Sequence, residues 1–215
     1  MKRTILLLVL MTLFKVSYSQ RYEIGVFAGG NNVIGDIGSD YYVNPNGITG
    51  GGLFKWNVNP RLALRANIFY SISTGNYIDS NYPYDSYSDE FAGDGERFEN
   101  HIGNGEILAE WNFLEYDLRT AKNHTPYMFL GIGGLIFDGS SSGRTIQIPF
   151  GVGYKYALSY KWVLGADLGF RYTFTNNLDA SEIKSVGNLN SNDWFTTLGL
   201  TLTYVFGRDP CCLGQ

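Results

Sequence analysis

The chain has 215 residues, enough for one domain of ordinary size, with 20 acidic and 16 basic side chains and a formal net charge of −4. An acidic chain of this kind lacks the positive surface that nucleic acids require, so we expect no nucleic-acid partner. Glycine contributes 27 residues, aromatic residues make up 16 % of the chain and charged residues only 17 %. This composition fits a membrane β-barrel better than a cytosolic enzyme.

The N-terminus has the pattern of a secretory signal peptide. A positively charged start and an apolar core over 5–14 precede Ser17 and Ser19, two small residues that fit a cleavage site after Ser19. We therefore expect residues 1–19 to be a signal peptide and the protein to be exported.

The remaining chain is expected to form a barrel over 20–207 followed by a flexible tail over 208–215. The tail contains the chain's two cysteines, Cys211 and Cys212. Adjacent cysteines cannot form a disulfide framework, and no further metal ligands lie nearby, so we assign them no role.

Apolar and polar residues alternate along much of the chain, which is the period of a β-strand. The alternation is clearest over 161–174, where every second residue from Trp162 to Phe174 is apolar or aromatic. The segment 126–137 is apolar on both faces, so the sequence leaves its register open. The predicted strands are 22–33, 48–58, 61–72, 105–118, 126–137, 145–158, 161–174 and 194–206.

These strands are long and carry aromatic residues at both ends, as membrane-spanning strands of roughly 9–11 residues do. The connections between them alternate in length. Short ones lie at 59–60, 119–125 and 159–160, and longer ones at 34–47, 74–104, 138–144 and 175–193. The sequence therefore predicts an all-β protein, an eight-stranded antiparallel transmembrane β-barrel of the outer-membrane type. Its short turns would face the periplasm and its long loops the outside.

The inward faces of the predicted strands combine glycines with charges of both signs. An eight-stranded barrel is just wide enough for side chains to fill it, so these charges can pair inside. We expect a packed polar interior, with a narrow ion path as the alternative. Arg61 and Glu106 are also placed on the inner face. The predicted interior charge network consists of Glu23, Lys55, Arg65, Glu110, Lys155, Asp167 and Arg171.

No catalytic, cofactor-binding or metal-ligating residues stand out. The chain has two histidines, His101 and His124, which the predicted topology places at opposite membrane faces without an obvious nucleophile beside either. The acidic segment 74–104 lacks the ordered spacing of a calcium loop. We therefore expect a non-enzymatic protein with no cofactor and no small-molecule substrate. A lipid-modifying enzyme is the weakest alternative.

Five segments together resemble the PorG family. They are YEIGVFAGGNNVIGDIG at 22–38, TPYMFLGIG at 125–133, IPFGVGYKY at 148–156, GFRYTFT at 169–175 and NDWFT at 192–196. That family comprises small outer-membrane barrels of the type IX protein secretion and gliding apparatus.

The resemblance implies an integral outer-membrane protein whose partners are membrane lipid, a periplasmic ring-forming lipoprotein and associated secretion subunits. On this reading the short turns make the contacts, and the candidate contact residues are Pro60, Arg119, Lys122, His124 and Tyr160. The alternative function is a small barrel that acts as an adhesin or envelope stabiliser through its outer loops. Segment 77–91 would then supply the binding surface, because tyrosines offer contact area at low entropic cost.

Overall fold

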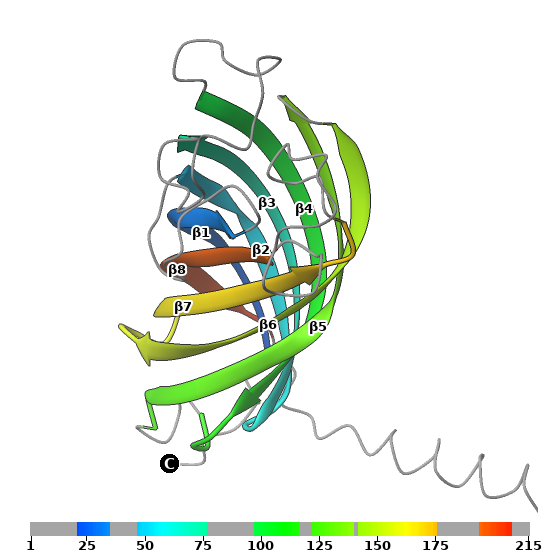
Figure 1. Cartoon of the computed structure of the whole chain (residues 1–215). Helices are drawn as coiled ribbons and strands as arrows, with labels where there is room; N and C mark the ends of the chain where they lie inside the picture. Colours follow the sequence, from blue (N-terminus) through cyan, green and yellow to red (C-terminus); the bar gives the residue numbers. More distant parts are fainter. Residues whose placement is uncertain are drawn as a thin grey trace, which may run out of the picture.

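The computed structural model describes residues 21–34, 47–76, 97–116, 122–139, 142–175 and 194–207. Each strand in these ranges pairs antiparallel with the next along the chain, and the last pairs with the first, which closes a barrel (Figure 1). The predicted eight-stranded antiparallel barrel is confirmed. The strands are β1 (Arg21–Ile34), β2 (Gly47–Asn59), β3 (Leu62–Asn76), β4 (Arg97–Asn112), β5 (His124–Gly139), β6 (Gly143–Ala157), β7 (Trp162–Thr173) and β8 (Trp194–Phe206).

The pairing register advances steadily around the barrel. Following paired residues from Tyr22 through all eight strands leads back to β1 at Asn32, ten residues further along. A barrel with such an offset has strands tilted by roughly 35–45° from its axis. Because the lumen is only as wide as its side chains, residues of strands that are not neighbours in the sheet meet across it.

One face of each strand is mainly apolar and points away from the lumen. Leu130, for example, is 58 % exposed on the outer face. A closed barrel with a continuous apolar outer surface would be poorly soluble in water and fits the hydrocarbon core of a bilayer. Aromatic rings stand at both ends of this surface, including Tyr22 and Phe206 at one end and Tyr172 and Trp194 at the other.

No helix of the described residues is long and apolar enough to cross a membrane.

The structure settles the register of β5, which the sequence left open. Tyr127 and Phe129 are buried in the lumen, whereas Met128 and Leu130 are exposed on the outer face. Both sets are apolar or aromatic because the lumen contains hydrophobic clusters as well as charges, so alternation alone could not distinguish them.

Two sequence predictions need correction at the strand ends. The fourth strand was expected over 105–118, but β4 spans Arg97–Asn112. Its first part is polar and resembles a loop, yet it pairs with the end of β3 as far as Arg97 opposite Asn76. At the other end, Asn112 donates its backbone N–H to the carbonyl of Arg61, and the chain bends away.

Arg61 was expected to point inward, and this is wrong. It lies in the β2–β3 turn, with its side chain 48 % exposed. The side-chain oxygen of Asn59 accepts hydrogen bonds from the backbone N–H groups of Arg61 and Leu62, both at 2.8 Å. Because of these hydrogen bonds the turn includes Arg61, and β3 begins at Leu62 rather than at residue 61 as predicted.

Apolar clusters fill the lumen at both ends of the described barrel. The end with the long connections contains Val33, Ile102, Leu135, Phe137 and Phe195. The end with the short connections contains Tyr116, Ala157, Val163 and Val205. The charged residues lie between these clusters, an arrangement that favours a packed interior over an ion path.

Candidate functional site

Eight charged side chains are buried in the described lumen, and their charges balance. Each of them is at most 4 % exposed. Burying a charge costs several kcal/mol unless it is paired, so their arrangement determines whether the barrel is stable. The four anions are Glu23, Glu106, Glu110 and Asp167, and the four cations are Lys55, Arg65, Lys155 and Arg171.

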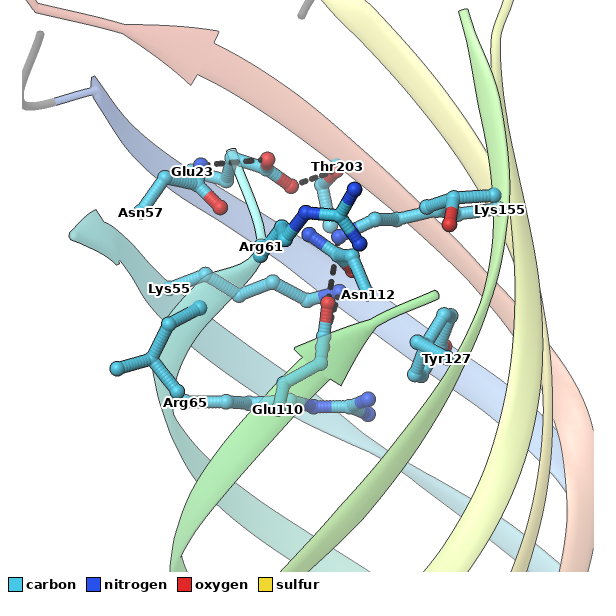
Figure 2. A network of polar contacts seen from close by, with 12 residues as sticks. Glu23, Lys55, Asn57, Arg61, Arg65, Glu110, Asn112, Tyr127, Lys155 and Thr203 are labelled. Atoms are coloured by element: carbon cyan, nitrogen blue, oxygen red, sulfur yellow. Dashed lines mark hydrogen bonds and ion pairs between the residues drawn. The ribbon is translucent and has the colours of Figure 1, made fainter. Parts of the chain in front are cut away.

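Glu110 on β4 is the centre of the first group of ion pairs in this network. Its carboxylate forms ion pairs with the ammonium groups of two lysines. That of Lys155 from β6 lies at 2.5 Å and that of Lys55 from β2 at 3.0 Å. Figure 2 shows both lysines reaching toward Glu110 from opposite walls. The two ammonium groups each lie 5.3 Å from the centre of the Tyr127 ring, whose face adds a favourable cation–π contact.

Arg65 on β3 forms the second pair, with Asp167 on β7 at 2.6 Å. The Tyr127 hydroxyl donates a hydrogen bond to the same carboxylate. The Nε of Arg65 donates to the side-chain oxygen of Asn67 at 2.7 Å. Tyr127 therefore joins the two ion-pair groups, because it contacts the lysines with its ring and Asp167 with its hydroxyl.

Arg171 on β7 and Glu106 on β4 form the third pair. Asn67 donates to the other oxygen of Glu106 at 3.1 Å, which links this pair to Arg65. The Arg171 guanidinium lies between the rings of Phe69 and Phe195, at 5.7 and 5.6 Å from their centres. The three pairs thus form one connected network.

Glu23 on β1 accepts hydrogen bonds from Asn57 at 2.8 Å and Thr203 at 2.9 Å (Figure 2). Its carboxylate is therefore held by neutral donors from the two adjacent strands.

All seven residues of the predicted network lie buried in the lumen. The sequence placed Glu106 on the inner face but did not assign it to the network, although it pairs with Arg171. Tyr127 was missed because it lies on the strand whose register was undetermined. An inward tyrosine close to several charges would have been the available signal.

The charged groups of the network bond to one another and to neighbouring side chains. In the described ranges, no group of three or more histidine, cysteine, aspartate or glutamate side chains could hold a metal ion. The four buried carboxylates of these strands are paired with cations or accept hydrogen bonds from neutral donors. The arrangement makes a rigid, neutral filling for the barrel.

The two histidines lie on the outer wall near opposite ends of the barrel. His101 on β4 shares a 2.7 Å hydrogen bond with Tyr70, and His124 at the start of β5 shares a 3.0 Å hydrogen bond with Tyr154. In both pairs the rings are also stacked, with centres 6.0 Å apart.

Charged side chains link two of the short turns. The Glu115 carboxylate lies 2.5 Å from Lys122 and 3.8 Å from Arg61, so it connects the β4–β5 segment to the β2–β3 turn. The hydrogen bond from Lys122 and the two positive charges lower the pKa of the Glu115 carboxyl below its ordinary value. Glu115 therefore remains ionised at neutral pH.

The other candidate contact residues occupy the same end. The carbonyl of Pro60 accepts hydrogen bonds from Asn112 at 3.0 Å and from the backbone of Tyr116 at 3.1 Å. Tyr160, in the β6–β7 turn, is 75 % exposed. Arg119 falls outside the described residues, as do the predicted signal peptide, Cys211, Cys212 and segment 77–91.

Residues 2–215 match a family model described as "Domain of unknown function (DUF6089)". The chain belongs to this family. No sequence among the curated proteins matches it significantly.

Solved structures of outer-membrane barrels resemble this DUF6089 protein. Neisserial surface protein A has 13 % sequence identity and a TM-score of 0.53, over 86 % of this chain and 97 % of its own. OprG from Pseudomonas aeruginosa has 12 % identity and a TM-score of 0.49, over 88 % and 97 %. The N-terminal barrel of Pseudomonas aeruginosa OprF has 16 % identity and a TM-score of 0.48, over 86 % and 97 %. At such identities, the likeness to the Neisserial protein establishes a shared fold alone.

Proposed function

We propose that this protein is an integral, non-enzymatic outer-membrane subunit of the type IX protein secretion and gliding machinery. Its role is to anchor or stabilise a periplasmic ring complex. The observation that carries the proposal is the lumen, which is packed, charge-balanced and closed by apolar clusters at both ends. A barrel filled in this way acts through its surfaces.

The outer wall supports the membrane location. Its apolar side chains form a band between two sets of aromatic residues, as in known outer-membrane barrels. Closure of the sheet leaves no unpaired strand edge, which a bilayer requires.

The end with the short turns supports the periplasmic contacts. It presents exposed charges at Arg61 and Lys122 and an exposed aromatic ring at Tyr160. Aromatic and arginine side chains are enriched where proteins bind one another. Together with the resemblance to the PorG family, these side chains favour a protein partner in the periplasm.

Charge reversal at the turns tests the proposal. We expect the Arg61→Glu, Lys122→Glu double variant to assemble in the outer membrane but to lose the periplasmic ring lipoprotein when the barrel is purified from a detergent extract. Cargo secretion should fall with it. Arg144→Glu is the matched control, because Arg144 is also exposed but lies at the opposite end of the barrel, near the start of β6.

A second arm addresses the adhesin alternative. Residues 77–96, between β3 and β4, are replaced by a short Gly/Ser linker. We expect this variant to assemble and secrete normally. If secretion survives the turn reversal while surface attachment is lost with the loop, the secretion role is wrong and the adhesin role replaces it.

A further inference from the structure

A shallow apolar hollow lies on the outer wall of the barrel, across β5 to β8. Its volume is about 400 Å³, and it is open toward the outside of the barrel. The side chains around it that point outward are Phe113, Pro126, Val152, Ala166, Leu168 and Leu198. They are all apolar, so the hollow suits a hydrocarbon ligand.

Small residues create the hollow. Ala166 pairs with the larger Tyr154 and Leu200 on the neighbouring strands, so the wall is low between them. Gly153 lines it as well. A Cβ at Gly153 would lie 2.4 Å from Cζ of Tyr127. Tyr127 therefore packs against the backbone of Gly153 from the lumen side.

The residues that line the hollow extend from the short-turn end toward the middle of the barrel. Phe113 and Pro126 lie at its lower end, where their backbones are joined by a 3.0 Å hydrogen bond. Leu168 and Leu198 are a directly opposed pair partway along β7 and β8. A groove in this direction follows the path of an acyl chain in the inner leaflet.

Polar side chains that do not line the hollow lie near its short-turn end. His124 lies two residues before Pro126, on the same face of β5, and its ring is bonded to Tyr154, the residue that pairs with Pro126. Lys122 precedes His124 by two residues and is exposed.

Among the described residues near the short-turn end of the hollow, Lys122, Arg61 and Glu115 carry a net positive charge. Lys122 and Arg61 both approach the single carboxylate of Glu115. These two cations and one anion leave one unit of positive charge from the described side chains where the headgroup of a lipid in the hollow would lie. Single lysine and arginine side chains near a membrane surface also attract anionic lipids.

We propose that this surface is a binding site for one anionic phospholipid of the inner leaflet. One acyl chain occupies the hollow over Ala166, and the phosphate lies near Lys122 and the His124–Tyr154 pair. The proposal depends on the membrane location but not on the secretion role.

Native mass spectrometry of the purified barrel, released from micelles that contain phosphatidylglycerol or phosphatidylcholine, tests the site. We expect the wild-type barrel to retain one phosphatidylglycerol. Ala166→Leu should reduce retention at least fivefold, because the added side chain fills the hollow. Ala109→Leu is the matched control, since Ala109 is an exposed, outward-facing alanine on β4 that does not line the hollow.

The headgroup is tested separately with the Lys122→Gln, His124→Gln double variant. It should retain both lipids about equally, without the preference for phosphatidylglycerol. If Ala166→Leu and Ala109→Leu retain the lipid equally, the acyl chain does not occupy the hollow. If the double variant still prefers phosphatidylglycerol, Lys122 and His124 do not bind the headgroup. Ala166→Leu should still co-purify with the ring lipoprotein, so the lipid site and the secretion role can fail independently.

Discussion

Replacing Glu110 with glutamine is expected to lower the free energy of unfolding by about 3–5 kcal/mol, the cost of breaking a buried ion pair by removing one partner. The change leaves the buried ammonium groups of Lys55 and Lys155 within about 3 Å of a neutral amide. Urea unfolding of the barrel in lipid vesicles, followed by tryptophan fluorescence, measures the loss.

Two variants serve as controls for this result. Glu115→Gln also removes a carboxylate from two cations, but at the exposed turn, where solvent screens the charges, and it should cause no measurable change. Glu110→Gln combined with Lys155→Gln restores the balance of charges and should cost less than Glu110→Gln alone. If Glu110→Gln is no more harmful than Glu115→Gln, the lumen is not the tightly paired network described here.

Leu130→Arg is expected to cost roughly 2–4 kcal/mol, because a charge on the lipid face is most unfavourable near the bilayer midplane. Leu130 lies in the middle of β5 and is 58 % exposed on the outer wall. The same vesicle unfolding assay applies, and it also tests the register of β5.

Leu158→Arg provides the comparison at another depth. Leu158 is 56 % exposed but follows the end of β6, in the short β6–β7 turn. The cost of arginine there should fall to roughly 0–1 kcal/mol, since the penalty decreases toward the interface. Equal costs at the two positions would contradict the membrane placement, and a harmless Leu130→Arg would indicate a register shifted by one residue.

The sequence predicted the strands best where one face is apolar and the other is polar. Over β7, the alternation from Trp162 to Thr173 agrees with the burial of every second residue from Val163. It failed where a strand continues as a polar segment, as β4 does between Arg97 and Asn104. Hydrophobic periodicity is weak there, because Ile102 is the one buried apolar residue among the described side chains of this stretch, and backbone pairing with β3 and β5 holds the rest of it.

Apart from Arg61, the sequence identified which charged residues face the lumen, but not which of them meet. Glu110 and Lys155 are on strands two apart in the sheet, and Arg65 and Asp167 are on strands four apart. Such pairs depend on the tilt and offset of the closed barrel, which a single strand does not encode. The position of Tyr127 between them could be known only once the register of β5 was fixed.

The claim that the working surface is periplasmic can be tested by photo-crosslinking in living cells. A benzophenone amino acid replaces Tyr160 in the β6–β7 turn or, as the control, Tyr70, an exposed tyrosine toward the opposite end of the barrel. We predict that irradiation joins the Tyr160 variant to a periplasmic ring lipoprotein and gives no such product with the Tyr70 variant. Products with cell-surface partners at position 70, and none at position 160, would contradict it.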